Sequence, residues 1–235
     1  MQCNVHGLSH VAAHWFPVNE TFDSLQGEGG FTGTPALFIR MQGCDVGCPW
    51  CDTKHTWPRD EARLVSQGEV KAKTALAEGS WAWFDVEQLA DVAHDSAARH
   101  IVITGGEPCQ YDLRQLIGRL QKTGKRVQVE TSGTYTPYVG RTAFLTVSPK
   151  YHMPGGRKVL ERALERADEF KFPVGKRSDI ETVLERLQPY SERHGTPIWL
   201  QPLSESRTAT ELCIEAAHRY GWRVSLQTHK FINIR

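Results

Sequence analysis

Cys44, Cys48 and Cys51 lie within eight residues and are the side chains best suited to chemistry. A structural zinc site takes four protein ligands, and His55 is the only near candidate for a fourth, so a metal held here would keep an open position. An iron–sulfur cluster is normally held by four thiolates, so three would leave one iron free for a small molecule. The alternative is a set of buried core thiols. Gly, Pro and Asp between the cysteines interrupt helical and strand periods, so we expect a metal or cluster loop.

Three residues separate the first two cysteines and two residues separate the second pair. This spacing resembles the cluster loop of the radical S-adenosylmethionine (SAM) enzymes. In that superfamily the amino acid end of SAM binds the fourth iron of a 4Fe-4S cluster. The resemblance therefore implies both of these cofactors.

Length and charge limit the classes of protein to consider. A chain of 235 residues suits one sizeable domain, since α/β barrels commonly reach this length. With 28 basic and 27 acidic residues the net charge is +1, which argues against nucleic acid held by bulk charge. No apolar run approaches the roughly 20 residues that span a bilayer, so we expect no membrane partner. No secretory leader is evident, and we expect the reducing cytoplasm rather than a disulfide-bonded secreted protein.

Short apolar runs alternate with segments of helical period along most of the chain. The expected strands are residues 35–41, 101–104, 126–130, 144–147, 169–172, 198–200 and 223–226. The expected helices are residues 83–99, 111–121, 159–167, 179–187 and 209–219. Strands alternating with helices imply parallel βα units. We predict an α/β fold, a partial (β/α)6-type barrel of the radical SAM kind.

The expected domain organisation is simple. Residues 1–16 show no clear period and are expected to form a flexible N-terminal extension. Residues 17–235 are expected to form a single domain. Residues 52–80 show no strand and are expected to be an irregular insertion after the cysteine loop, carrying one irregular helix.

Polar motifs follow most of the expected strands. They are the cysteine loop, Gly105-Gly106-Glu107-Pro108, Glu130-Thr131-Ser132-Gly133, Ser148-Pro149-Lys150, Gln201-Pro202 and Gln227-Thr228-His229-Lys230. Each alone is ordinary turn chemistry. Because ligands bind at the C-terminal ends of barrel strands, the succession of polar ends predicts one shared site.

Arg40 is a charged residue within an expected buried strand. Such a charge needs a partner, either an anionic ligand at the barrel mouth or a structural ion pair. We favour the ligand because arginine recognises carboxylates bidentately. The glycine run at residues 27–30 is either a close approach to a ligand or a plain turn.

Several motifs together resemble the 7-carboxy-7-deazaguanine synthase family over about residues 16–235. They are Leu25-Gln26-Gly27-Glu28-Gly29, residues 44–57, Ile103-Thr104-Gly105-Gly106-Glu107-Pro108, Glu130-Thr131-Ser132-Gly133, Val147-Ser148-Pro149-Lys150 and Gln227-Thr228-His229-Lys230. The resemblance implies conversion of 6-carboxy-5,6,7,8-tetrahydropterin to 7-carboxy-7-deazaguanine with loss of ammonia, a step toward queuosine. It also implies Mg²⁺, a homodimer, and an electron donor such as flavodoxin.

The resemblance assigns roles residue by residue. Cys44, Cys48 and Cys51 would hold the cluster. The implied SAM residues are Trp50, Cys51, Asp52, Gly106, Glu107, Glu130, Ser148, Pro149, Lys150 and Gln201. The implied pterin residues are Leu25, Gln26, Gly27, Glu28, Arg40, Thr104 and His229. Thr53 would bind Mg²⁺, although chemistry alone indicates a helix cap; Cys109 and Cys213 are expected to pack in the core.

The end of the chain is apolar at Phe231, Ile232 and Ile234. This pattern predicts that the tail folds back over the barrel, placing His229 in the pocket and the terminal carboxylate of Arg235 near the pterin. The alternative is a docked terminal strand whose carboxylate lies in water.

Two other functions fit part of the pattern. A glycyl-radical activating enzyme has the same cysteine spacing but acts on a protein backbone. A non-enzymatic zinc-binding interaction module would need a fourth ligand and a basic face, and the sequence offers neither clearly.

Overall fold

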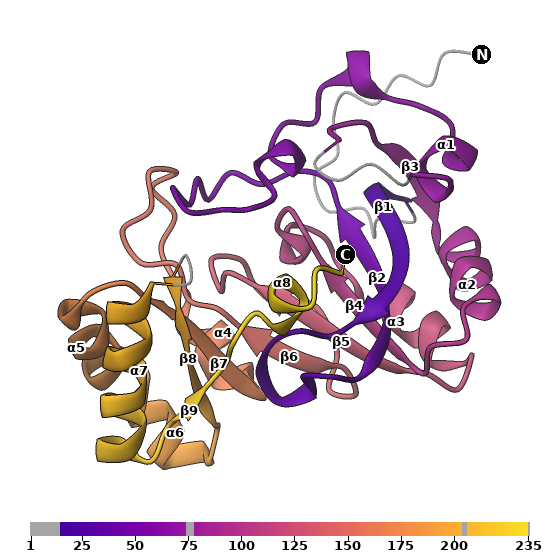
Figure 1. Cartoon of the computed structure of the whole chain (residues 1–235). Helices are drawn as coiled ribbons and strands as arrows, with labels where there is room; N and C mark the ends of the chain where they lie inside the picture. The colour runs from indigo at the N-terminus through magenta and orange to yellow at the C-terminus, as the bar shows by residue number, and fades with distance from the viewer. Residues whose placement is uncertain (1–14, 74–77, 204–205, 235) are drawn as a thin grey trace.

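The computed structural model describes residues 15–73, 78–203 and 206–234, which contain one nine-stranded sheet in the order β3-β1-β2-β4-β5-β6-β7-β8-β9 (Figure 1). The strands are β1 (Trp15–Leu25), β2 (Pro35–Met41), β3 (Ala82–Asp85), β4 (His100–Thr104), β5 (Arg126–Thr131), β6 (Phe144–Val147), β7 (Glu169–Val174), β8 (Ile198–Pro202) and β9 (Arg223–Val224). The α-helices are α1 (Gln67–Lys71), α2 (Val86–Asp95), α3 (Arg114–Gln121), α4 (Glu161–Arg166), α5 (Arg177–Arg186), α6 (Gln188–His194), α7 (Arg207–Tyr220) and α8 (Thr228–Phe231).

The parallel part of the sheet is the predicted one. Every expected strand corresponds to β2 or to one of β4–β9, and each neighbouring pair in this series is parallel. The expected helices correspond to α2, α3, α4, α5 and α7. Strands β3 and β9 lie at opposite edges of the sheet, so across the described residues it stays open. The α/β partial barrel is confirmed.

Two antiparallel strands were not predicted. β1 pairs with β2 and with β3, so the sheet extends beyond the parallel core. The extension expected to reach Phe16 is two residues too long, because Trp15 and Phe16 begin β1 and Phe16 is fully buried. Residues 1–14 lie outside the described part. Trp83, expected to begin a helix, lies in β3, and Asp85 caps α2 in a capping box with Gln88.

The insertion at residues 52–80 is largely irregular, as expected, with residues 74–77 outside the described part. It contains the 3-10 turns η2 (Lys54–Thr56) and η3 (Glu61–Arg63) and the short helix α1. Ser66 and Glu69 form a capping box at the start of α1. Helix α6 was not predicted; Pro189 lies in its first turn, and Gly195 ends it in the left-handed conformation.

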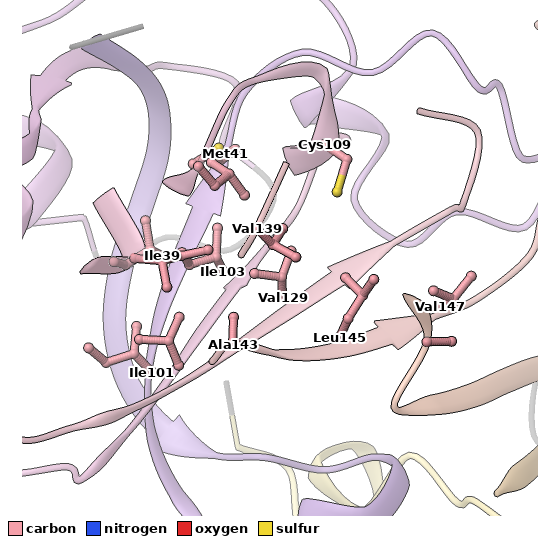
Figure 2. Close-up of a cluster of buried hydrophobic side chains, with 14 of the residues drawn as sticks. Ile39, Met41, Ile101, Ile103, Cys109, Val129, Val139, Ala143, Leu145 and Val147 are labelled. Atoms are coloured by element: carbon pink, nitrogen blue, oxygen red, sulfur yellow. The ribbon is translucent and has the colours of Figure 1, made fainter. Parts of the chain in front are cut away.

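The two faces of the parallel strands differ in character. One face carries Ile101, Ile103, Val129, Leu145 and Val147, which pack in the hydrophobic core with Ile39 and Met41 (Figure 2). Cys109 and Cys213 belong to the same buried core, so their packing role is confirmed. The other face carries buried polar residues, listed along the sheet as His100, Gln128, Thr146, Glu169 and Lys171.

This polar face forms the interior of the barrel and leads toward the C-terminal ends of the strands.

Within the described ranges, no helix has the length and apolar character required to cross a membrane.

Candidate active site

A cavity of about 250 Å³ opens where the parallel strands end. The predicted site residues that line it are Glu28, Cys44, Cys48, Trp50, Cys51, Asp52, Thr53, Gly106, Glu107, Glu130, Ser148, Lys150 and Gln201. The polar strand ends and the cysteine loop therefore share one space, as the barrel topology predicts.

The cysteine loop is held by backbone hydrogen bonds to the segment that follows it. Gly43 N donates to Thr56 O at 2.7 Å, and Cys44 N donates to Trp57 O at 3.0 Å. Gly47 has φ +73, a conformation that favours glycine, and it packs against the backbone of Gly155. These contacts hold the loop over the cavity.

The three thiols are half-buried at the cavity wall. Burial, aided by the neighbouring Glu107 carboxylate, raises the pKa of Cys44 to about 12, and burial also raises the pKa of Cys48. Iron binds the thiolate form, so loading a cluster here must release protons.

The donor set consists of three free cysteines, one fewer than the four thiolates of a fully protein-bound cluster. A four-iron cluster needs its thiolates spread over three different irons, and the trio provides three. The residues present therefore fit a cluster with one iron left to a non-protein ligand.

Thr53 does not act as a helix cap. It occupies the N-cap position of η2 but makes no side-chain capping bond. Its Oγ1 lies 3.5 Å from Cys51 Sγ, and the residue lines the cavity. The capping interpretation is wrong, and the hydroxyl faces the space in which ligands would bind.

Gly106 and Glu107 connect the ends of β4 and β5. A Cβ at Gly106 would meet Gly43 O at 2.5 Å, so only glycine fits there. The buried Glu107 carboxylate accepts from Cys109 N at 2.9 Å, Thr131 Oγ1 at 2.6 Å and Ser132 N at 2.8 Å. The side chain of Glu107 is therefore occupied in fixing the end of β5.

A buried charge cluster forms the far wall. Lys171 contacts the Glu28 carboxylate and lies 3.4 Å from Glu130 Oε2. Glu28 also accepts from Gln227 Nε2 at 2.7 Å and from Gln201 Nε2 at 3.2 Å. Burial alone would raise the pKa of Glu28, but Lys171, together with the Gln227 hydrogen bond and the nearby His229, lowers that pKa to about 2.

Lys150 is a second buried lysine at the cavity. Its Nζ donates to Ser148 O at 2.9 Å, and burial lowers its pKa. Pro149, which was predicted to bind SAM, is buried and is not among the residues that line the cavity.

The other predicted pterin residues are not among those that line the cavity. They are Leu25, Gln26, Gly27, Arg40, Thr104 and His229. Gln26 Nε2 donates to Glu130 Oε1 at 3.0 Å, and Thr104 Oγ1 donates to Glu130 Oε2 at 3.2 Å. These two side chains therefore orient Glu130 from behind the cavity wall.

The glycine run turns against protein rather than against the cavity. Gly29 N donates to Ser225 Oγ at 2.8 Å, and Gly30 N donates to Glu169 Oε2 at 3.0 Å. Of this segment, Glu28 is the residue that reaches the cavity.

The C-terminal segment folds back, but not through its apolar side chains. Phe231 is 62% exposed and Ile232 is 56% exposed, so the expected apolar packing is wrong. Polar contacts hold the segment instead: Thr228 N donates to Gly27 O at 3.1 Å, and Lys230 Nζ lies 3.4 Å from Asp52 Oδ2. Arg235 lies outside the described residues.

Lys171 and Gln227 contact the site but were not predicted as part of it. Lys171 is a charged residue within the expected strand at residues 169–172, so the argument applied to Arg40 would have identified it. Gln227 belongs to a motif that was noted, yet its contact with Glu28 depends on the long-range return of the chain.

Comparisons with known proteins agree with this geometry. Residues 38–188 match the model of the radical SAM superfamily. The chain is 50% identical to 7-carboxy-7-deazaguanine synthase of Escherichia coli K12 over 93% of the chain and 99% of that protein. It is 35% identical to the Synechocystis protein of the same name, over 97% and 98%. A crystal structure of QueE from Escherichia coli matches with TM-score 0.86 and 48% identity, covering 90% of this chain and 93% of that one.

Proposed function

Because the chain belongs to the 7-carboxy-7-deazaguanine synthase family of the radical SAM superfamily, we propose that it converts 6-carboxy-5,6,7,8-tetrahydropterin to 7-carboxy-7-deazaguanine with loss of ammonia. It is a radical SAM enzyme and a carbon–nitrogen lyase of queuosine and 7-deazapurine biosynthesis. The observation that carries this conclusion is the three-thiol loop opening onto the same cavity as the polar strand ends.

The two other functions lose their support. Relatives that match over more than nine-tenths of the chain carry the synthase name, not that of a glycyl-radical activating enzyme. A zinc-binding interaction module is not the class of protein that the match of residues 38–188 to the radical SAM superfamily indicates.

The cofactors define what the protein must do. When bound, a 4Fe-4S cluster and SAM would supply the radical chemistry that takes a hydrogen from the pterin. Cys44, Cys48 and Cys51 would hold the cluster. The backbone at Gly106 and the strand ends at Glu130, Ser148 and Gln201 would orient SAM, while the buried wall excludes water from the reacting atoms.

The pterin would lie between the SAM residues and the segment that carries Glu28. Arg40 would contribute charge to its carboxylate from behind the cavity wall. Thr53 would provide an oxygen ligand to Mg²⁺, a cation that keeps several waters and needs few protein ligands. Thr53 is half-buried at the cavity wall, and this position supports the assignment.

Other features complete the proposal. An external reductant, such as flavodoxin, would reduce the cluster in the cytoplasm.

The exposed apolar side chains of Phe231 and Ile232 suit a contact with a second copy, which supports a homodimer. Sedimentation analysis of the purified protein tests the dimer directly.

Anaerobic reconstitution tests the whole assignment. We expect about four irons and four sulfides per chain, SAM cleavage, and 7-carboxy-7-deazaguanine detected by mass spectrometry when the pterin is added. One zinc per chain with no SAM cleavage would remove the radical mechanism. SAM cleavage without this product would keep the mechanism and change the substrate.

A further inference from the structure

Lys171 holds together two acidic residues that come from different parts of the chain. Its Nζ contacts Glu28, in the segment after β1, and lies 3.4 Å from Glu130 of β5. The lysine side chain is 8% exposed, so it does not extend into solvent. An ammonium group this deeply buried needs anionic partners, and here it has two.

Glu28 presents a carboxylate at the cavity surface, and side chains from three other segments hold it there. Gln227 and Gln201 donate to Oε1, while Lys171 contacts Oε2. The carboxylate lines the cavity, and although Oε1 already accepts two hydrogen bonds, Oε2 keeps one lone pair besides the one that Lys171 uses. It is therefore a fixed acceptor facing the space in which the substrate would bind.

We propose that Lys171 is a specificity-determining residue that holds Glu28 as a carboxylate and so selects heterocycles with a 2-amino-4-oxo edge over their 2,4-dioxo counterparts. The inference rests on the proposed function, because a pterin carries this edge. Lys171 lies outside the motifs that carry the family resemblance.

The selectivity follows from hydrogen-bond chemistry. A carboxylate only accepts, and the 2-amino group and N3–H of a pterin both donate. In a lumazine the 2-amino group is replaced by a carbonyl, whose lone pairs would face those of the carboxylate. A protonated Glu28 would tolerate lumazine, since it could donate to that carbonyl. Ionised Glu28 therefore rejects the wrong edge by repulsion as well as by a lost bond.

Other charged groups also face the pair. Glu130 and Glu169 surround Lys171, and His229 and Lys150 influence the neighbourhood of Glu28. Burial raises the pKa of Glu28 in opposition to Lys171, whose charge is the main influence lowering it. Replacing Lys171 by Met leaves burial unopposed by that charge, so the pKa of Glu28 rises. Selectivity should then be lost at low pH and return as pH rises through the new pKa.

The test measures binding of 6-carboxypterin and 6-carboxylumazine, two fluorescent and unreactive probes, to the reconstituted enzyme with SAM between pH 5.5 and 8.5. In the parent we expect a pterin preference of about 100-fold or more, nearly independent of pH. In Lys171→Met the preference should fall below about 5-fold at pH 6 and recover at high pH. Lys171→Arg should keep most of it, and Lys122→Met, at an exposed lysine, should keep all of it.

A second set of variants guards against misfolding. The amide in Glu28→Gln can both donate and accept, so this variant should lose the pterin preference at every pH. Adding Lys171→Met to Glu28→Gln should cause no further loss of that preference. A parental preference retained in Lys171→Met at pH 6 overturns the inference, while product formation by the parent leaves the proposed function intact. A parent that forms no product but shows Lys171-dependent preference overturns the proposed function alone.

Discussion

Arg40 of β2 is paired across the sheet with Glu20 of β1, with 2.5 Å between Nε and Oε1. The guanidinium carbon also lies 5.6 Å from the centre of the Phe22 ring. A Cβ at Gly105 would meet Arg40 Cγ at 1.9 Å, so the glycine makes room for the arginine stem. Arg40 therefore forms the structural ion pair that the sequence left as an alternative. Its Nε donates the hydrogen bond of this pair to Glu20.

Replacing Arg40 by Lys tests whether this residue also serves the substrate. The charge is kept but the planar fork is lost, so we expect pterin affinity to fall about 10-fold while SAM affinity changes less than about 2-fold. Fluorescence titrations of the reconstituted enzyme with each ligand provide the measurement. Equal losses for both ligands would assign Arg40 to structure alone.

Cys48→Ala should give a folded protein that lacks the cluster. Cys48 is half-buried in a loop, so the free energy of unfolding should change by less than about 1 kcal/mol. Iron content and the visible absorbance of the reconstituted protein report the loss. Cys109→Ala is the matched control: this thiol is in the core, so stability should fall by about 1–3 kcal/mol while the cluster remains. SAM cleavage by Cys48→Ala would contradict the assignment of the loop.

Thr53→Ala should lower turnover and flatten its dependence on Mg²⁺ at normal iron content. The hydroxyl makes no capping bond, so removing it should cost little stability. Thr53→Ser keeps the oxygen and should retain the parental Mg²⁺ titration. An unchanged titration in Thr53→Ala would mean that Mg²⁺ binds elsewhere or is not required.

The sequence predicted the strands and helices that are encoded by local residue patterns. β2 and β6 have the predicted bounds because short apolar runs between turn residues encode buried parallel strands. β1 was missed, since its identity as a strand depends on pairing with β2 and with β3, which lies more than 50 residues later.

The same distinction holds in the site. The cysteine trio could be read from spacing, whereas the Glu28–Lys171 pair joins residues separated by 143 positions. The polar tail contacts were missed for the same reason, because Phe231 and Ile232 indicated packing that the fold does not provide. Long-range contacts decided each of these cases, and a single sequence does not reveal them.

The Glu28–Lys171 pair should make stability depend on pH in the acid range. The pKa of Glu28 is about 2 in the folded protein against an ordinary value of 4.5. As pH falls, Glu28 is therefore protonated at a lower pH in the folded state than in the unfolded state. The resulting stability is present above pH 4.5 and is lost as pH falls toward 2. The shift corresponds to about 3 kcal/mol.

Urea unfolding between pH 6 and pH 2.5 measures this dependence. In Glu28→Gln the slope of unfolding free energy against pH should decrease over the acid range, by at most the slope that the titration of one group contributes. Glu61→Gln, at an exposed carboxylate, should leave the slope at its parental value. Parental slopes in both variants would show that Lys171 does not lower the pKa of Glu28.

Gly27 and His229 are in direct contact where the C-terminal segment docks, and we expect this contact to control the docking. A Cβ at Gly27 would meet His229 Nδ1 at 2.2 Å, while Gly27 O accepts the Thr228 N–H that anchors α8. Gly27→Ala should therefore displace the segment, and amide hydrogen exchange at residues 227–232 should speed up about 10-fold or more. Gly118→Ala is the matched control, because a Cβ there meets nothing within 4 Å and exchange in the tail should not change.

The second variant separates displacement of the segment from loss of the histidine. His229→Ala in the Gly27→Ala background removes the clashing ring, so the tail should dock again and its slow exchange should return. Pterin affinity should remain low in this double variant if His229 contacts the substrate, and should recover if the histidine only fills space beside Gly27. Unchanged exchange in Gly27→Ala would show that the contact does not control docking of the segment.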